Sequence, residues 1–214
     1  ISVYARNKDY HTVIKKKLII LQKYLDEKFS IKSKYFVDSS PVFEKALAQY
    51  AGLGWIGKHT NLVSKKIGSW FFLSELFLSE KIDADNPEIN NCGNCTSCIE
   101  SCPTQAFDSE YNLDARKCIS YLTIEHKGVF PMSLRKKIGN KIYGCDDCLS
   151  VCPWDKFSEI TSEKEFFAKK TLMNPELKKF LVLKECNFNF FFQKSPIKRI
   201  GWVRFMRNVI IATG

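Results

Sequence analysis

Apolar residues in the first part of the chain recur at the spacing of a helix. Ile14, Leu18, Leu21 and Leu25 lie three or four positions apart, and lysines fill the polar positions between them. This period predicts an amphipathic helix over residues 12–29, with its lysines on a solvated face.

The pattern then changes to that of strands and turns. Residues 34–38 favour a short strand that ends on an acidic residue. Ser40, which is followed by a proline, is typical of the N-cap of a helix over residues 42–50. The glycines of residues 52–60 permit positive φ or the close approach of a bulky ligand to the backbone.

Large apolar residues dominate the other patterned segments. Residues 69–79 are rich in Phe and Trp and predict one or two buried strands, whereas residues 164–183 and 197–214 have helical patterns. The phenylalanine-rich run 187–192 would promote aggregation if it were exposed. We therefore expect this run to be buried, and the neighbouring Cys186 to be a buried apolar residue rather than a ligand.

Composition limits the class of protein. With 214 residues, 45% of them apolar, the chain can form one large domain or two small ones. No apolar run approaches the roughly 18–20 residues that span a bilayer, so we expect no membrane partner. The formal net charge of +10 suits an anionic partner such as RNA, although many basic proteins bind none. The chain lacks an initial Met and stops within a helical pattern, which predicts a piece of a longer protein.

The candidate chemistry is concentrated in a cysteine-rich run. Cys92, Cys95, Cys98 and Cys102 have the spacing C-x2-C-x2-C-x3-C-P, known from bacterial ferredoxins with two clusters. In that arrangement three cysteines hold one iron–sulfur cluster and the fourth ligates another cluster. The motif therefore requires a second set of thiolates elsewhere in the chain.

The second set is a later run that also ends in Cys-Pro, completed by the isolated Cys118. The cross-over of ligands between runs then predicts two [4Fe–4S] clusters. The first set of ligands is Cys92, Cys95, Cys98 and Cys152, and the second set is Cys102, Cys118, Cys145 and Cys148.

Two other interpretations of the cysteines are weaker. A disulfide framework is typical of short secreted chains, and this sequence has no signal peptide. Structural zinc requires neither the third cysteine of the first run nor the two Cys-Pro endings. Oxygen-sensitive clusters in a chain without a targeting signal indicate a reducing cytosol, so we expect a cytoplasmic protein.

Clusters alone transfer electrons, whereas an enzyme also needs a substrate site and a source of protons. Asp38 is the leading candidate, because ligands of open α/β sheets bind at the carboxyl ends of strands. Asp38 is equally suited to capping the helix that follows it. His59, beside the glycine-rich turn, is a ligand contact or an ordinary hydrogen-bonded residue. A further polar group is just as ambiguous and comprises Tyr4, Arg6, Tyr10 and His11.

Several motifs together resemble the epoxyqueuosine reductases, and they cover nearly all of the chain. They are both cysteine runs, Val37-Asp-Ser-Ser-Pro-Val42, Gly52-Leu-Gly-Trp-Ile-Gly-Lys-His-Thr-Asn61 and Ser195-Pro-Ile-Lys-Arg-Ile-Gly-Trp202. The resemblance implies an enzyme that reduces epoxyqueuosine to queuosine at the wobble position of tRNA, with cobalamin and two [4Fe–4S] clusters as cofactors.

The fold class implied by the resemblance is α+β, in three parts. Residues 1–84 would be the C-terminal part of a nitroreductase-like α/β domain that binds cobalamin. Residues 85–157 would be a ferredoxin-like domain with two [4Fe–4S] clusters. Residues 158–214 would be a helical region that leads into HEAT-like repeats and is truncated.

The resemblance also implies roles for single residues. Asp38 matches the family's proton donor, and this role requires it to be desolvated beneath the corrin, because a solvated carboxylate is ionised at neutral pH. We expect contacts to cobalamin from Asp38, His59, Thr60, Leu62, Ser120, Cys145 and Asp146. We expect contacts to the substrate from Tyr4, Arg6, Lys127, Gly128, Val129, Lys198, Arg199 and Arg204.

We expect a monomer that binds tRNA carrying epoxyqueuosine and takes electrons from a donor of flavodoxin or ferredoxin type. Three other functions fit part of the pattern. A two-cluster electron carrier would leave residues 1–91 without a role. Reductive dehalogenases with cobalamin have similar cluster pairs but are commonly exported. A cluster-bearing RNA-binding module would bind unmodified RNA as well as it binds tRNA carrying epoxyqueuosine.

Overall fold

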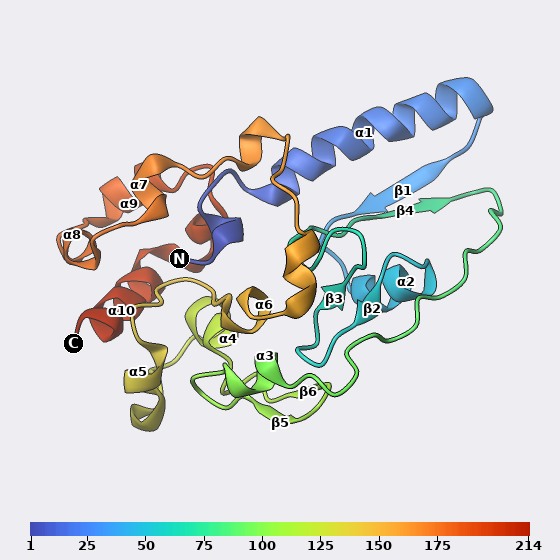
Figure 1. Cartoon of the computed structure of the whole chain (residues 1–214). Coiled ribbons are helices and arrows are strands. Elements are labelled where there is room, and N and C mark those ends of the chain that lie inside the picture. The colour runs from blue at the N-terminus through green and yellow to red at the C-terminus, as the bar shows by residue number, and fades with distance from the viewer.

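The computed structural model describes residues 1–214 as a mixed structure of helices and short antiparallel strands (Figure 1). The mixed α+β class expected from the sequence is confirmed. The longest helix, α1 (Tyr10–Phe29), projects from the body beside the ribbon formed by β1 (Ser33–Phe36) and β4 (Glu75–Leu78). None of the helices has both the length and the apolar composition needed to cross a bilayer.

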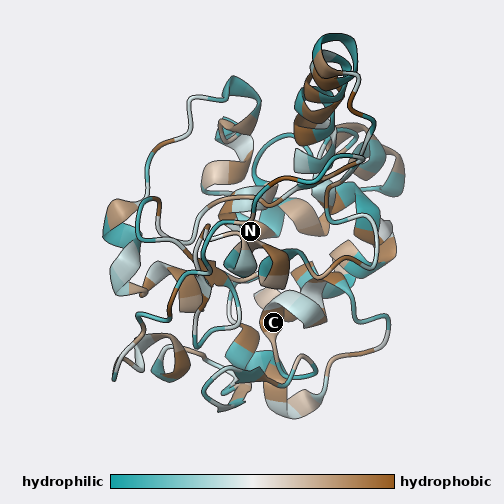
Figure 2. Cartoon of the chain, turned by 90° about the vertical axis from the view of Figure 1, so that its right-hand side faces the viewer, coloured by the Kyte–Doolittle hydropathy of each residue, from teal (hydrophilic) through white to brown (hydrophobic).

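Helix α1 confirms the helix predicted over residues 12–29. Asp9 caps its start by accepting the backbone N–H of His11, and Ser30 ends it in a left-handed conformation. Its apolar stripe is only partly covered, since Leu18 is buried and Leu21 is exposed. A ribbon of two strands is too narrow to cover the whole stripe, and Figure 2 shows hydrophobic positions along the projecting helix.

The segment between β1 and β4 contains α2 (Glu44–Tyr50), which packs against the hairpin of β2 (Trp55–Ile56) and β3 (Leu62–Val63). The prediction that Ser40 is an N-cap is wrong. Ser40 lies in a turn in which its carbonyl accepts the N–H of Val42, and α2 begins later without a side-chain cap.

The prediction of buried strands over residues 69–79 is correct only for the part that forms β4. Residues 69–74 lie outside the strands, and β4 is mostly half-buried. The physical reason is that β4 has a single neighbour, β1, and the ribbon is not enclosed between two layers.

The cysteine-rich segment folds from short elements, and its two cysteine runs lie side by side because α3 packs on α6. These elements are α3 (Ser97–Glu100), β5 (Phe107–Ser109), β6 (Asn112–Leu113), α4 (Ile119–Ile124), α5 (Met132–Ile138) and α6 (Asp147–Ser150). The 3-10 helices of the chain are η1 (Val3–Ala5), η2 (Pro153–Phe157), η3 (Lys164–Phe166) and η4 (Pro196–Ile200).

The C-terminal helices are α7 (Lys170–Met173), α8 (Leu177–Leu181), α9 (Glu185–Phe191) and α10 (Gly201–Thr213). They form the largest apolar core together with Ala5 of η1 and with Ile142 and Tyr143, which precede α6. Residues from all three predicted parts of the chain therefore share one core.

The prediction that the phenylalanine-rich run 187–192 is buried is correct for only part of the run. Phe188 and Phe192 are fully buried, whereas Phe190 is 77% exposed. Cys186 is also exposed, contrary to expectation. Helix α9 explains the difference, because residues 188 and 192 lie on one face of a helix and residues 186 and 190 point elsewhere.

Buried polar contacts attach α10 to α4. Asn208 is fully buried, and its amide Nδ2 donates to the carbonyls of Thr123 at 2.7 Å and Ile142 at 2.9 Å. Arg207 donates to the carbonyls of His126 and Gly128 and lies over the ring of Phe130. These bonds fix the position of the loop that follows α4.

Candidate metal and cofactor site

Four cysteines line a small cavity of ≈ 30 Å³. Cys92, Cys95 and Cys98 come from the loop and first turn at α3, and Cys152 follows α6. The structure thus brings together the four thiols that the cross-over of ligands assigns to the first cluster. The other residues of this cavity are Lys58, His59, Pro153 and Trp154.

Polar groups of the chain are aimed at the cysteine sulfurs. Trp55, which is fully buried, donates its indole N–H to Cys92 Sγ at 3.4 Å, and the backbone N–H of Ala106 donates to Cys102 Sγ at 3.3 Å. Such bonds are typical of iron–sulfur sites, where they adjust the reduction potential. Burial raises the pKa of Cys98 to about 11 and that of Cys148 to about 12. These thiols keep their protons until a cation displaces them.

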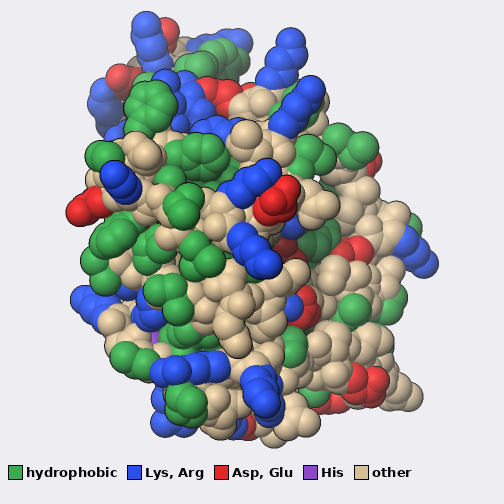
Figure 3. Space-filling view, turned by 90° about the vertical axis from the view of Figure 1, so that its left-hand side faces the viewer, with side chains coloured by type: hydrophobic (Ala, Val, Ile, Leu, Met, Phe, Trp, Pro, Cys, Tyr) green, Lys and Arg blue, Asp and Glu red, His purple; other side chains and the backbone are tan.

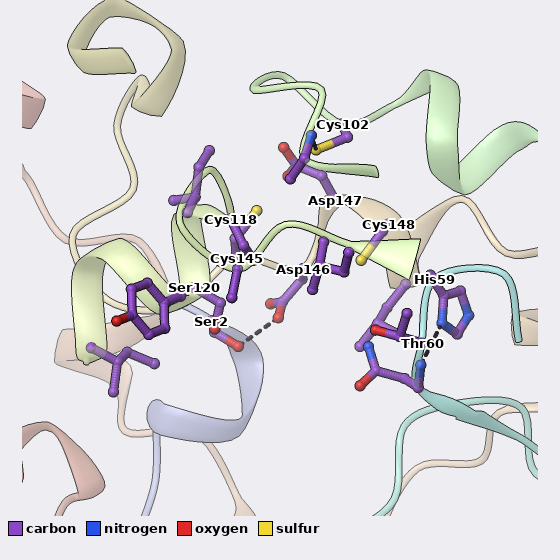
Figure 4. A pocket seen from close by; sticks show the side chains of 18 of the residues that line it. Ser2, His59, Thr60, Cys102, Cys118, Ser120, Cys145, Asp146, Asp147 and Cys148 are labelled. Atoms are coloured by element: carbon purple, nitrogen blue, oxygen red, sulfur yellow. Dashed lines mark hydrogen bonds between the residues drawn. The ribbon is translucent and has the colours of Figure 1, made fainter. Parts of the chain in front are cut away.

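The other four predicted ligands line a second cavity, of ≈ 490 Å³. Figure 4 shows Cys102, Cys118, Cys145 and Cys148 on its walls, together with Ser120, His59 and Thr60. Because this cavity is much larger than the first, a cluster at its cysteines would leave room for a further group. Asp38, Tyr10 and Lys45 also line it.

Both sets of thiols fit clusters better than single ions. No three His, Cys, Asp or Glu side chains converge closely enough to hold one metal ion. Structural zinc needs four ligands at about 2.3 Å from one centre. In a [4Fe–4S] cube each thiolate binds a different iron, so the sulfurs stand farther apart around a common centre.

Asp38 follows β1 in a left-handed conformation with φ of 46°. Tyr10 donates its hydroxyl to Asp38 Oδ2 at 2.5 Å, and the backbone N–H of Asp38 donates to Glu44 Oε1 at 2.6 Å. The carboxylate therefore does not cap α2. Its side chain is 67% exposed, so the desolvation that a proton donor needs has to come from a bound group.

Two further carboxyl groups, those of Glu44 and Glu75, lie near Asp38. Burial, together with the neighbouring carboxyl groups of Glu44 and Asp38, raises the pKa of Glu75 to about 7. Glu75 Oε2 is buried without a hydrogen-bond partner.

The structure places most of the predicted cobalamin contacts around the large cavity. Asp38, His59, Thr60, Ser120, Cys145 and Asp146 line it. Leu62 does not, because its position in β3 directs it into the protein, where it is 4% exposed. The carboxylate of Asp146 accepts the hydroxyl of Ser2 at 2.5 Å and the N–H of Val3 at 2.8 Å, so it also anchors the N-terminal segment (Figure 4).

The predicted substrate contacts are divided between the cavity and the surface. Tyr4 and Arg199 line the cavity, and Arg199 is paired with Glu125 at 2.6 Å. Arg6 donates to the carbonyl of Ile1 and Arg204 donates to that of Ile124, so both guanidinium groups are committed to the backbone. The remaining contacts lie on the surface and outside the cavity; they are Lys127, Gly128, Val129 and Lys198.

Sequence reasoning missed two side chains at the site. Lys45 Nζ donates to the carbonyl of Thr60 at 2.9 Å and to Asn61 Oδ1 at 2.8 Å, and it thereby supports the turn on the cavity wall. Trp55 bonds a cysteine more than thirty residues away. Trp55 lies within the quoted motif over residues 52–61, but the motif does not say that its indole faces a cysteine, and the position of Lys45 in the chain does not indicate its contact with the turn.

Two protein-family models match the chain. Residues 91–155 match the 4Fe-4S double cluster binding domain, and residues 1–39 match the family described as epoxyqueuosine reductase QueG, DUF1730. The fold and the paired thiol sets thus define an iron–sulfur protein with a double-cluster domain.

Known proteins narrow the identification. The epoxyqueuosine reductase of Vibrio cholerae is 45% identical over 215 residues, which cover 100% of this chain and 58% of the relative. An epoxyqueuosine reductase solved with an epoxyqueuosine-modified tRNA-Tyr stem loop superposes with a TM-score of 0.93, at 34% identity, over 98% of this chain and 56% of that one. The Bacillus subtilis epoxyqueuosine reductase was solved with its catalytic aspartate loop swung out of the active site. It superposes with a TM-score of 0.91, at 33% identity, over 98% of this chain and 56% of that one.

Over its whole length this chain is similar to the epoxyqueuosine reductases. It spans less than two thirds of the length of the relatives that it matches.

Proposed function

We propose that this protein reduces epoxyqueuosine to queuosine in tRNA. The observation that carries the proposal is that Asp38 and the four thiols of the second set line one cavity. A site for proton donation and a site for electron delivery therefore face the same space. A simple electron carrier would not need this cavity.

We also propose that the two sets of thiols ligate two [4Fe–4S] clusters as the cross-over predicts. The parts of the chain would then be a cobalamin-binding part over 1–84, a ferredoxin-like part over 85–157 and the start of HEAT-like repeats over 158–214. The match of a double-cluster domain to residues 91–155 supports the middle part.

Cobalamin is the proposed cofactor at the large cavity, which would take part of it, and when bound it would supply the cobalt chemistry that passes two electrons to the epoxide. Thr60, Ser120 and Asp146 would hold it, with Asp38 on the cavity wall. A bound corrin would also cover the exposed carboxylate of Asp38. Leu62 is not part of this proposal.

Asp38 would supply a proton to the oxygen that leaves. Removing an epoxide oxygen as water consumes two electrons and two protons and leaves a carbon–carbon double bond. Tyr10 orients the carboxyl group through its hydroxyl, and Glu44 holds the backbone of the same loop. The swung-out aspartate loop of the Bacillus subtilis relative supports a loop that moves as a unit.

The proposed partners are tRNA carrying epoxyqueuosine and an external electron donor of flavodoxin or ferredoxin type, with the protein as a monomer in the cytoplasm. The relative solved with a modified tRNA stem loop supports the first partner. Lys127, Gly128, Val129 and Lys198 are exposed and would contact tRNA together with Arg199. Basic side chains are distributed among acidic and apolar ones over the face of the C-terminal helices (Figure 3).

The test uses protein reconstituted anaerobically with iron, sulfide and cobalamin. Asp38→Asn should keep the absorbance of both cofactors but convert no epoxyqueuosine in a modified stem loop, as read by nucleoside mass spectrometry. Asp83→Asn, at an exposed position, is the matched control and should be fully active. Normal turnover by Asp38→Asn would refute the proton-donor role.

A further inference from the structure

His59 occupies the boundary between the two cavities. It is 3% exposed and contributes to the lining of both. It lies in the turn between β2 and β3, and Figure 4 shows it beside Thr60 at the edge of the larger cavity. The smaller cavity on its other side contains the four thiols of the first set.

The hydrogen bonds of His59 fix its tautomer. The backbone N–H of Asn61 donates to His59 Nδ1 at 3.2 Å, and a backbone N–H can act only as a donor. Nδ1 therefore carries the lone pair, and in the neutral ring the proton is on Nε2. Burial and the nearby Lys45 lower the pKa of His59 to about 4, in agreement with a neutral ring.

The Nε2–H group has no partner within the chain. Nε2 is buried without a hydrogen bond, and a buried donor in this state is unfavourable unless a bound group accepts from it. Apart from His59 itself, the side chains of the smaller cavity offer only cysteine sulfur as acceptor.

Gly57 makes room for this orientation of the ring. A Cβ at position 57 would lie 3.2 Å from His59 Cε1 and 3.4 Å from Nε2, and it would also lie 2.9 Å from Val63 Cγ2. The imidazole is thus packed directly on the backbone of Gly57. The hairpin fixes both the tautomer and the direction of the free N–H.

We propose that His59 donates its Nε2–H to a sulfur of the first cluster and raises the reduction potential of that cluster. The inference rests on the proposed ligation of this cluster by Cys92, Cys95, Cys98 and Cys152. Reduction adds negative charge to a cluster, and N–H groups aimed at its sulfurs stabilise that charge. Trp55 would also raise this reduction potential, through its N–H bond to Cys92 Sγ.

The test is a redox titration of the anaerobically reconstituted protein, followed by electron paramagnetic resonance. His59→Leu removes the donor and should lower the midpoint potential of one cluster while the other stays unchanged. His59→Gln retains an N–H and should restore part of the difference. Trp55→Phe identifies the affected cluster, because it should lower the same potential.

Each other outcome overturns the proposal. If both potentials are unchanged in His59→Leu, His59 does not bond a cluster. If only the spectrum of added cobalamin changes, its N–H serves the larger cavity. Iron content separates this test from the proposed function: a wild-type protein that binds no iron refutes the ligation itself, whereas two intact clusters with unshifted potentials refute only the role of His59.

Discussion

Single residues at this site are held by partners that lie far away in the sequence. Asp38 receives the hydroxyl of Tyr10 from α1, and its own backbone N–H bonds Glu44 of α2. The carboxylate is thus oriented from two elements while remaining open to the cavity. The chain therefore orients the carboxyl group of Asp38, whereas a bound ligand has to shield it from water.

The contribution of Tyr10 can be measured. Tyr10→Phe removes one hydrogen bond to the carboxyl group of Asp38, a loss that typically costs about 0.5–1.5 kcal/mol. We expect single-turnover conversion of epoxyqueuosine to slow by roughly twofold to tenfold, with cluster content unchanged. Tyr24→Phe, at an exposed position of the same helix, should react at the normal rate. An equal rate in Tyr10→Phe would show that Asp38 is oriented without it.

Glu75 predicts a pH dependence of stability. Its pKa is about 7 in the folded protein and 4.5 in the reference state, so between these values the folded state binds the additional proton. The free energy of unfolding should therefore fall as the pH rises from about 4.5 to 7. Glu75→Gln should flatten this slope in chemical denaturation, whereas Glu80→Gln, which changes an exposed carboxyl, should not. An unchanged slope in Glu75→Gln would contradict the raised pKa.

At the scale of elements, α10 depends on buried polar bonds rather than on apolar contacts alone. Asn208→Ala would leave the carbonyls of Thr123 and Ile142 without their donor. Leaving a buried polar group unsatisfied costs about 1–3 kcal/mol. For a chain of this size we expect the melting temperature to fall by about 2–4 °C per kcal/mol. Val203→Ala, at a position 71% exposed on the same helix, should melt normally in circular dichroism.

The elements also show what the sequence can reveal. Local periodicity predicts α1 correctly, and cysteine spacing groups the same thiols that the two cavities bring together. Both signals need only residues close in sequence, plus one known rule of cross-over. The errors occur where a short pattern does not determine the local geometry or the buried face: Ser40 lies in a turn instead of a cap, and Cys186 is exposed on α9. The contacts expected of Leu62 and Arg204 stay predictions; Leu62 is buried and Arg204 donates to backbone carbonyls.

At the scale of the whole molecule, the paired sets of thiols would act as two cross-links between distant segments. Each proposed cluster takes ligands from both cysteine runs, and α3 and α6 pack together where these runs meet. In residues 92–118 and 145–152 the only buried apolar residues are Cys98 and Ala106, so metal binding would contribute much of the folding free energy of these two segments. Removing iron with a chelator should therefore loosen residues 92–118 and 145–152 more than the C-terminal core, as hydrogen exchange can show.

Because ligands cross over between the two cysteine runs, losing Cys152 should have an effect that only this topology predicts. Cys152→Ser removes a ligand at the far end of the second run, yet it should eliminate the cluster held mainly by the first run. Iron per chain should fall by about half, from eight to four, and the indole N–H of Trp55 should lose its cluster-bound partner and exchange faster. Cys186→Ser, at an exposed cysteine outside both cavities, should keep all of its iron. If Cys152→Ser instead lost the cluster of Cys145 and Cys148, each run would hold its own metal. The two cavities would then be misassigned, because Cys152 would belong with the second set of thiols and not with the first.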